Sequence, residues 1–269
     1  MKKRVLSLLM AFGLLMSTVS SNSFMRKYSD AINRSSSSET QTENGEDEGD
    51  GGFVGEDETE YGTTSEDDEV IVPTTTTTSL PPKNVKDTDI VRVRDYIPDA
   101  DVEIIYATDR NFTGKVIYNF EDAWLRYGTV KKLKKAQEKL KKKGYYLKIW
   151  DSFRPVEAQW ELWNACPDPK YVSDPNKGYS SHSRGNAVDV TLVDENGWEI
   201  DMPTGFDNFT ALADRNYSDV KSKDAVENAK LLEKIMKECG FKPYSAQWWL
   251  YIDTKKYDVD EKFDPSDYE

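Results

Sequence analysis

The stretch "SSHSRGNAVDVTLVD", from Ser180 to Asp194, contains the residues on which both the fold and the chemistry of this chain depend. Its second half is rich in β-branched residues and predicts a strand, and Gly185 precedes it where a tight turn requires glycine. His182, the only histidine, stands seven residues before Asp189. A loop followed by a strand can bring this imidazole and this carboxylate onto one metal ion. The same spacing also fits a simple hydrogen-bonded pair, so the stretch alone leaves both interpretations open.

Around this stretch, the spacing of apolar residues predicts helices and strands in mixed order, without a regular βαβ repeat. The expected helices span residues 128–144, 154–166 and 222–240. The expected strands span residues 145–153 and 247–253, and a hairpin is expected over residues 186–202. This order favours an α+β fold with a mostly antiparallel sheet flanked by helices.

The chain divides into three parts by composition. Residues 1–22 combine basic residues, an apolar run and small residues, which predicts a secretory signal peptide, with an uncleaved signal anchor as the alternative. Residues 23–87 are acidic and rich in Ser and Thr, have no Lys or Arg from Ser35 to Pro82, and predict a disordered tether. Residues 88–269 contain all seven Trp and suit one folded domain.

The formal net charge of −13 arises in the acidic segment and says little about the folded part. No basic block suggests nucleic acid as a partner, and contact with a membrane is expected only through an uncleaved signal anchor. The signal and the tether together predict a protein that is secreted or associated with the cell envelope. Cys166 and Cys239 lie in the folded part, where they form either one disulfide or two buried free thiols.

Five motifs in a fixed order carry a family resemblance. The stretch from Ser180 fits the pattern S-x-H-x-x-G-x-A-x-D, and the other four motifs are "YATDRNFTG", "IWDSFRP", "DMPTGFDNF" and "GFKPYSAQWWLYI". Together they resemble the D-Ala-D-Ala dipeptidases of the vancomycin-resistance type, which are zinc metallopeptidases of the lysostaphin/D-Ala-D-Ala peptidase group. The resemblance covers about residues 88–254. It implies a D-Ala-D-Ala peptidase or hedgehog-like fold, zinc as cofactor, and D-Ala-D-Ala or peptidoglycan stem peptides as partners.

The resemblance also implies roles for individual residues. His182 and Asp189 match the first two zinc ligands of the family. Arg154 matches the arginine that stabilises developing negative charge, a task that suits its planar fork of donors. The positions that contact the dipeptide in the family are occupied here by Ser180, Tyr106 and Asp109.

Two positions depart from the family pattern. Gln247 stands at the position of the catalytic base, where the family has Glu, and Leu250 stands at the position of the third zinc ligand, where the family has His. A neutral amide cannot accept a proton from water at useful pH, and leucine has no lone pair to give. Because a catalytic zinc needs about three protein ligands, the two replacements argue against zinc binding and against hydrolysis.

Three interpretations therefore stay open from the sequence. The first is an exported member of the family that is catalytically impaired and binds cell-wall peptides. The second is an active zinc D-Ala-D-Ala dipeptidase with non-standard ligation. The third is a purely structural envelope protein whose former pocket is filled, with Leu250 adding apolar bulk beside Trp248 and Trp249.

Overall fold

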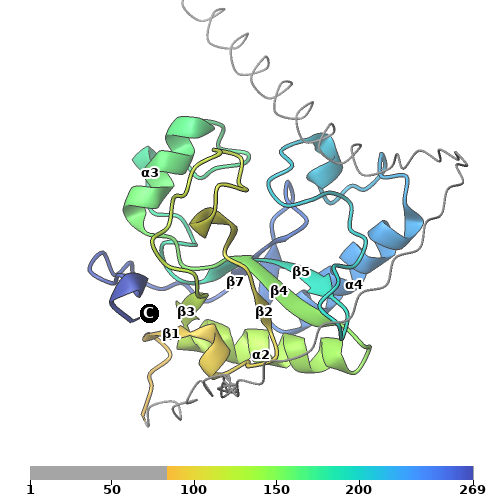
Figure 1. The fold of residues 1–269 in the computed structure, drawn as a ribbon, viewed down its shortest axis with the longest axis horizontal. Coiled ribbons are helices and arrows are strands. Elements are labelled where there is room, and N and C mark those ends of the chain that lie inside the picture. The colour runs from red at the N-terminus through yellow and green to blue at the C-terminus, as the bar shows by residue number, and fades with distance from the viewer. Residues whose placement is uncertain (1–83, 269) are drawn as a thin grey trace, which may run out of the picture.

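The computed structural model of the chain describes residues 84–268, so the expected signal peptide and nearly all of the expected tether lie outside the described residues. The helices within this range are α2 (Tyr127–Lys141), α3 (Val156–Ala165) and α4 (Lys223–Glu238). The strands are β1 (Ile90–Arg92), β2 (Asp101–Val102), β3 (Trp124–Arg126), β4 (Tyr146–Asp151), β5 (Ala187–Val193), β6 (Phe241–Pro243) and β7 (Leu250–Asp253). The expected mixture of helices and strands is confirmed (Figure 1). No helix between residues 84 and 268 has the length and apolar character that crossing a membrane requires.

The main sheet has five strands in the order β2-β4-β5-β7-β6, and β1 pairs with β3 in a separate two-stranded sheet. β2 runs parallel to β4, and the other neighbours in the main sheet run antiparallel. Every residue of the central strand β5 is buried, so both of its faces are covered. α2 and α4 pack against each other, whereas α3 lies away from both, at the upper left of Figure 1.

The two long helices form where the sequence places apolar residues at helical spacing. In α2, Val130, Leu133 and Leu140 are buried, and Gly144, with a φ of 82°, ends the turn that follows the helix. α4 begins at Ser222, whose hydroxyl accepts a hydrogen bond from the backbone N–H of Ala225 at 3.1 Å. Both helices therefore follow their predicted ranges to within a few residues.

The hairpin predicted over residues 186–202 forms only in part. Its first arm is β5, and its second arm reaches β5 through a single bridge between Val193 and Glu199. The second arm has apolar residues at alternate positions, but Trp198 is 74% exposed and Ile200 and Met202 are only partly buried, so little apolar area holds this arm against the sheet. β6 was not predicted from the sequence, because three residues are too few to show a periodic pattern.

The strand predicted over residues 247–253 begins only at Leu250, and the three residues before it form a turn. The backbone N–H of Trp248 donates to the carbonyl of Ala213 at 2.9 Å instead of joining a sheet. Its indole N–H donates to the hydroxyl of Thr204 at 2.9 Å. These bonds hold Trp248 in the core. β7 is therefore shorter than the strand that was predicted over residues 247–253.

Cys166 and Cys239 are both buried free thiols, so the structure contains no disulfide between them. Burial raises the pKa of the Cys166 thiol to about 11, and it also raises the pKa of the Cys239 thiol. Both thiols are therefore protonated at neutral pH and pack as small apolar side chains.

Candidate functional site

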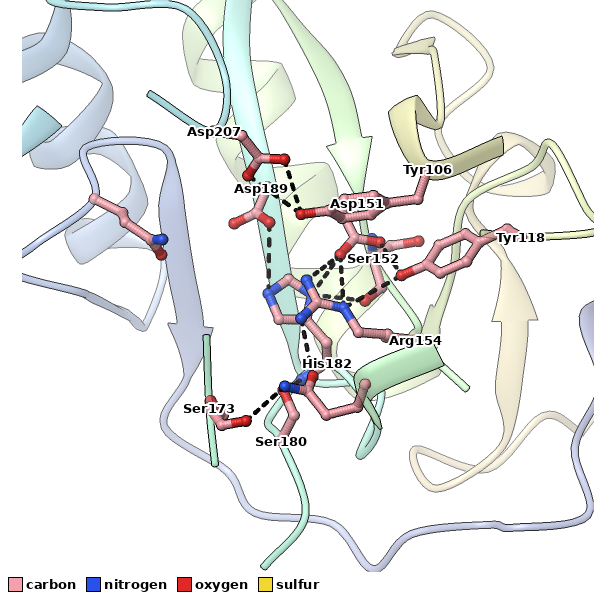
Figure 2. A network of polar contacts seen from close by, with 12 residues as sticks. Tyr106, Tyr118, Asp151, Ser152, Arg154, Ser173, Ser180, His182, Asp189 and Asp207 are labelled. Carbon is pink, nitrogen blue, oxygen red and sulfur yellow. Dashed lines mark hydrogen bonds and ion pairs between the residues drawn. The ribbon is translucent and has the colours of Figure 1, made fainter. Parts of the chain in front are cut away.

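Three neighbouring strands contribute one row of side chains at the centre of the sheet. Asp151 in β4 pairs with Asp189 in β5, and Asp189 pairs with Leu250 in β7. Because directly opposed residues of adjacent strands project from the same face of a sheet, these side chains are neighbours. His182 reaches the same place from the loop before β5 (Figure 2). The row therefore gathers two carboxyl groups and an imidazole, and it ends on a leucine.

The loop before β5 turns tightly at Gly185. The N–H of this glycine donates to the carbonyl of His182 at 2.8 Å, and its φ of 70° lies in the region that glycine adopts without strain. A Cβ atom at this position would also meet the side chain of Arg126 at 3.3 Å. The turn directs His182 back toward the start of β5. The prediction that Gly185 forms a tight turn before the strand is therefore confirmed.

The tautomer of His182 follows from its hydrogen bond. Its Nδ1 lies 2.8 Å from the carbonyl oxygen of Ser152, which can only accept, so Nδ1 carries the proton. Nε2 then holds the lone pair and lies 3.6 Å from Oδ2 of Asp189. Burial, assisted by the positive charge of Arg154, lowers the pKa of His182 to about 4. The imidazole is therefore neutral at neutral pH, which is the state that binds a metal ion.

Asp189 is buried and incompletely hydrogen-bonded. Its Oδ1 has no hydrogen-bond partner among the residues that the structure describes. Burial, followed by the negative charge of Asp151, raises the pKa of this carboxyl well above its ordinary range. A buried oxygen without a donor costs about 1–3 kcal/mol, and a proton or a cation would satisfy it. His182 and Asp189 thus form a corner that offers two ligands.

Asp151 was not identified from the sequence as part of the site. Its Oδ1 accepts from the hydroxyl of Tyr118 at 2.9 Å and from the backbone N–H of Ser152 at 2.8 Å. Its Oδ2 accepts from Nη2 of Arg154 at 2.5 Å and from Nε at 3.2 Å. The sequence did contain a feature that could have identified Asp151 as a site residue, because it stands three residues before Arg154 in the motif "IWDSFRP". Its pairing with Asp189, however, depends on strand register and is visible only in the fold.

Asp151, His182 and Asp189 offer ligand atoms within 4.8 Å of one another, which is compact enough for a metal ion. Asp151 nevertheless lies on the wrong side of the imidazole, because its Oδ2 is 3.5 Å from the protonated Nδ1. Both of its oxygens also accept from other donors, and ligation would break its ion pair with Arg154. The residues present therefore fit a two-ligand corner and do not fit a catalytic zinc site, which needs about three protein ligands.

The two departures from the family pattern lie against this corner. Leu250 stands opposite Asp189 in the register of β5 and β7. Gln247 lies in the turn before β7, where its Nε2 donates to the carbonyl of Tyr171 at 3.1 Å. Both residues line the small central cavity beside His182. The corner thus meets an apolar side chain and a neutral amide, and neither of them can activate a water molecule.

Arg154 is buried inside a network of partners. It forms an ion pair with Asp151, and its Nη1 donates to Oε1 of Gln159 at 2.9 Å. Its guanidinium carbon lies 5.4 Å from the ring centre of Tyr106. Figure 2 shows the arginine enclosed between Tyr118 and the carboxyl groups. The guanidinium therefore neutralises Asp151 first, and only its remaining N–H groups are left for a ligand.

The residues expected to contact a dipeptide are not all brought together. Tyr106 and Ser180 line the central cavity, whereas Asp109 is exposed and does not line it. Tyr106 donates its hydroxyl to the carboxyl oxygens of Asp207, at 3.0 and 3.2 Å. Asp207 was not singled out from the sequence, although the motif "DMPTGFDNF" contains it. Burial raises the pKa of Asp207 to about 7, so it adds a weakly acidic group to the cavity wall.

The central cavity is almost filled by its own walls. Its volume is about 30 Å³, which is close to the share of one water molecule in the liquid. Tyr171 and Phe209 help to close it, with stacked rings whose centres lie 4.9 Å apart. A dipeptide can therefore enter only if these walls move apart.

Known proteins whose sequences are similar to this chain are named D-alanyl-D-alanine dipeptidases. A family model described as D-ala-D-ala dipeptidase matches residues 86–265. The D-alanyl-D-alanine dipeptidase of Escherichia coli (strain K12) is 40% identical over 164 residues, which cover 61% of this chain and 84% of that protein. The D-alanyl-D-alanine dipeptidase of Enterococcus faecium is 34% identical over 167 residues, which cover 55% of this chain and 82% of that protein. Among solved structures, VanYB in complex with D-Alanine-D-Alanine matches 52% of this chain and 74% of that chain with a TM-score of 0.33 at 16% identity, too weak a likeness to argue from.

Proposed function

Because this chain belongs to the D-Ala-D-Ala dipeptidase family, we propose that it acts at the peptidoglycan as an exported binding protein that no longer hydrolyses peptides. The family match over residues 86–265 supports a peptidoglycan-related role for the folded part. The signal-like residues 1–22 support export to the cell envelope or beyond it. Cell-wall peptides that end in D-Ala-D-Ala are candidate ligands, because the relatives are named for that dipeptide.

The observation that carries the loss of hydrolysis is the pairing of Leu250 with Asp189 across β5 and β7. Because the side chain opposite Asp189 is apolar, His182 and Asp189 are the two ligands that a metal ion would find here. Asp151 does not replace the third ligand, because Arg154 engages it. Gln247 cannot take a proton from water at neutral pH. Within residues 84–268 the site therefore lacks both a third zinc ligand and the base that would act on a bound water.

Two observations favour a second candidate, a purely structural envelope protein. The central cavity measures only about 30 Å³, and Arg154 is engaged by Asp151. Under this candidate the family fold persists while the former peptide site stays closed to every ligand. The two candidates differ in one measurable respect, because only a binding protein retains affinity for cell-wall material.

Restoring the two family residues tests the loss of chemistry. Zinc content and D-Ala release from D-Ala-D-Ala are measured for the wild type, for Gln247→Glu, for Leu250→His and for the double variant. We expect only the double variant to gain both stoichiometric zinc and D-Ala release. The single variants are the matched controls, because a general base contributes roughly 10²–10⁴-fold only where its water is in place. Stoichiometric zinc and D-Ala release in the wild type, both lost in His182→Ala, would instead establish an active dipeptidase with other ligation.

Co-sedimentation with purified peptidoglycan sacculi separates the binding protein from the structural one. The assay is run at about 0.15 M ionic strength, where attraction between exposed charges is screened beyond about 8 Å. We expect the wild-type chain to sediment with the sacculi. A chain that stays in the supernatant would favour the structural candidate.

A further inference from the structure

A second cavity lies beside the central one and differs from it in size and character. This outer cavity has a volume of about 250 Å³ and lies between α3 and the short 3-10 helix η3 (Pro175–Lys177). Its walls include Val156, Gln159, Trp160, Tyr179, Ser180 and Ser183. None of the residues that line it carries a charge at neutral pH. It therefore offers a ligand-sized space that selects against ionic groups.

Two exposed aromatic side chains flank the outer cavity. Trp160 is 40% exposed and Tyr179 is 46% exposed, and they are two of only six large hydrophobic side chains exposed within residues 84–268. The ring of Tyr179 is held in place, because its hydroxyl donates to Glu261 and the guanidinium of Arg184 lies 5.8 Å from the ring centre. Exposed aromatic rings gathered around a hollow are typical of a binding site.

A buried hydroxyl in the same cavity lacks a partner. Ser183 lines the outer cavity and is 1% exposed, and its Oγ has no hydrogen-bond partner in the described part of the chain. Buried hydroxyls are normally hydrogen-bonded, and an unsatisfied one costs about 1–3 kcal/mol. Because this Oγ is enclosed, it meets a ligand only after the Ser183 side chain rotates toward the cavity, and a hydroxyl or amide group bound there would then remove this cost. The cavity thus combines aromatic faces with an unsatisfied polar group.

The outer cavity adjoins the centre of the family chemistry. Ser180 lines both cavities. Gln159, in the wall of the outer cavity, accepts a hydrogen bond from Arg154 at 2.9 Å and donates one to the carbonyl of Ser173 at 2.7 Å. A group bound in the outer cavity is therefore separated from the central cavity by one layer of side chains.

The chemistry of the outer cavity selects one part of the peptidoglycan. Stem peptides carry free carboxylates and amines, which proteins recognise with charged groups, and no charged residue lines this cavity. The N-acetylhexosamines of the glycan strand have a face of C–H groups and a rim of hydroxyl and acetamido groups. The C–H face suits the negative face of an aromatic ring, and the rim suits Ser183. A volume of about 250 Å³ lies just below the range of about 300–1,000 Å³ for drug-sized ligands, which fits one sugar ring.

We propose that the outer cavity binds one N-acetylhexosamine ring of the glycan strand, packed against Trp160 and Tyr179 and hydrogen-bonded to Ser183. This inference rests on the proposed role at the peptidoglycan and adds the part of the polymer that is recognised. It also provides binding without any opening of the central cavity. The protein then holds the glycan next to the position where its relatives cleave a dipeptide.

Titration with the tetramer of N-acetylglucosamine, followed through the ¹⁵N-labelled indole signals, tests this site. We expect the Trp160 signal to shift while the signal of Trp198, which is more exposed and lies in the turn after β5, stays unchanged. Trp160→Ala is expected to weaken tetramer binding by at least about tenfold, and Trp198→Ala is the matched control that leaves it unchanged. Ser183→Ala is expected to weaken binding, and Tyr179→Phe, which keeps the ring and loses the bond to Glu261, to preserve it.

Thermal unfolding of each variant first shows that it is folded. An unchanged tetramer affinity in Trp160→Ala, or the absence of any shift of the Trp160 signal, would overturn the inference. If the wild type and Trp160→Ala sediment equally with sacculi, the role at the peptidoglycan stands and the glycan assignment fails. If the wild type binds the tetramer through Trp160 without sedimenting with sacculi, the outer cavity is a sugar site and the role at the peptidoglycan fails.

Discussion

The buried carboxyl of Asp207 makes a contribution to stability that falls as the pH rises. Asp207 is 3% exposed, and burial raises its pKa from an ordinary 3.8 to about 7, although the hydrogen bond from Tyr106 and the charge of Arg154 oppose the rise. Between these two values the native state keeps a proton that the unfolded chain has released. Asp207 therefore contributes stability that is fully present below pH 3.8 and is lost as the pH rises through about 7. The difference between the two pKa values corresponds to about 4 kcal/mol.

Urea unfolding between pH 4 and pH 7 measures this contribution when the wild type is compared with Asp207→Asn. The variant is neutral at every pH, so it lacks the titration while keeping a similar shape. We expect its free energy of unfolding, relative to the wild type, to rise by about 3 kcal/mol from the acidic to the neutral end of this range. Asp109→Asn, which removes a carboxyl from the surface, serves as the control for the loss of one negative charge.

The test depends on how the difference in free energy of unfolding between the variant and the wild type changes with pH. A general destabilisation by the substitution lowers the stability of the variant by the same amount at every pH and leaves this slope unchanged. A difference between Asp207→Asn and the wild type that stays constant with pH would refute the reasoning, since Asp207 would then titrate in the native state as it does in the unfolded chain. A slope of the opposite sign would mean that the bond from Tyr106 outweighs burial.

Two further predictions concern the centre of the polar row. In ¹H–¹⁵N NMR spectra, His182 is expected to show a protonated Nδ1 and a pKa of about 4, so its contribution to stability is present above its ordinary value of 6.5 and is lost as the pH falls through about 4. An imidazole that titrates near 6.5 would contradict the buried, neutral state. Asp151→Asn is expected to lower the free energy of unfolding by about 3–5 kcal/mol in urea at neutral pH, because it leaves the charge of Arg154 buried and unpaired. A loss below about 1 kcal/mol would show that the pair behaves like an exposed one.

Local signals in the sequence predicted the elements that rest on local physics. The apolar spacing of α2 and the N-cap at Ser222 fixed the two long helices, because helix formation depends on neighbours three and four residues away. The glycine turn and the β-branched run after it fixed the loop and strand that carry His182 and Asp189. The alternating residues around Trp198 also predicted a second hairpin arm, but that arm joins the sheet through one bridge only, because Trp198 stays exposed and buries little apolar area.

The remainder of the site depends on contacts between distant segments, which no local pattern records. Asp151 meets Asp189 through a strand register that includes an irregularity after Ile149. Tyr106 meets Asp207 across 101 residues of sequence. The volumes of the two cavities depend on how side chains from several loops pack, so neither the near closure of the central cavity nor the presence of the outer one was predictable.

The polar residues of the family can persist here for structural reasons alone. Arg154 and Asp151 are both buried, so removing either one leaves the other charged and unpaired at a cost of about 3–5 kcal/mol. His182 is likewise bonded to the backbone of Ser152, and its loss would leave a buried carbonyl without its donor. The Leu250 side chain has no such partners, and it adds apolar area at the position where the family resemblance implies a ligand. A retained His–Asp–Arg set is therefore weak support for a reaction, and the residue that stands opposite Asp189 discriminates better.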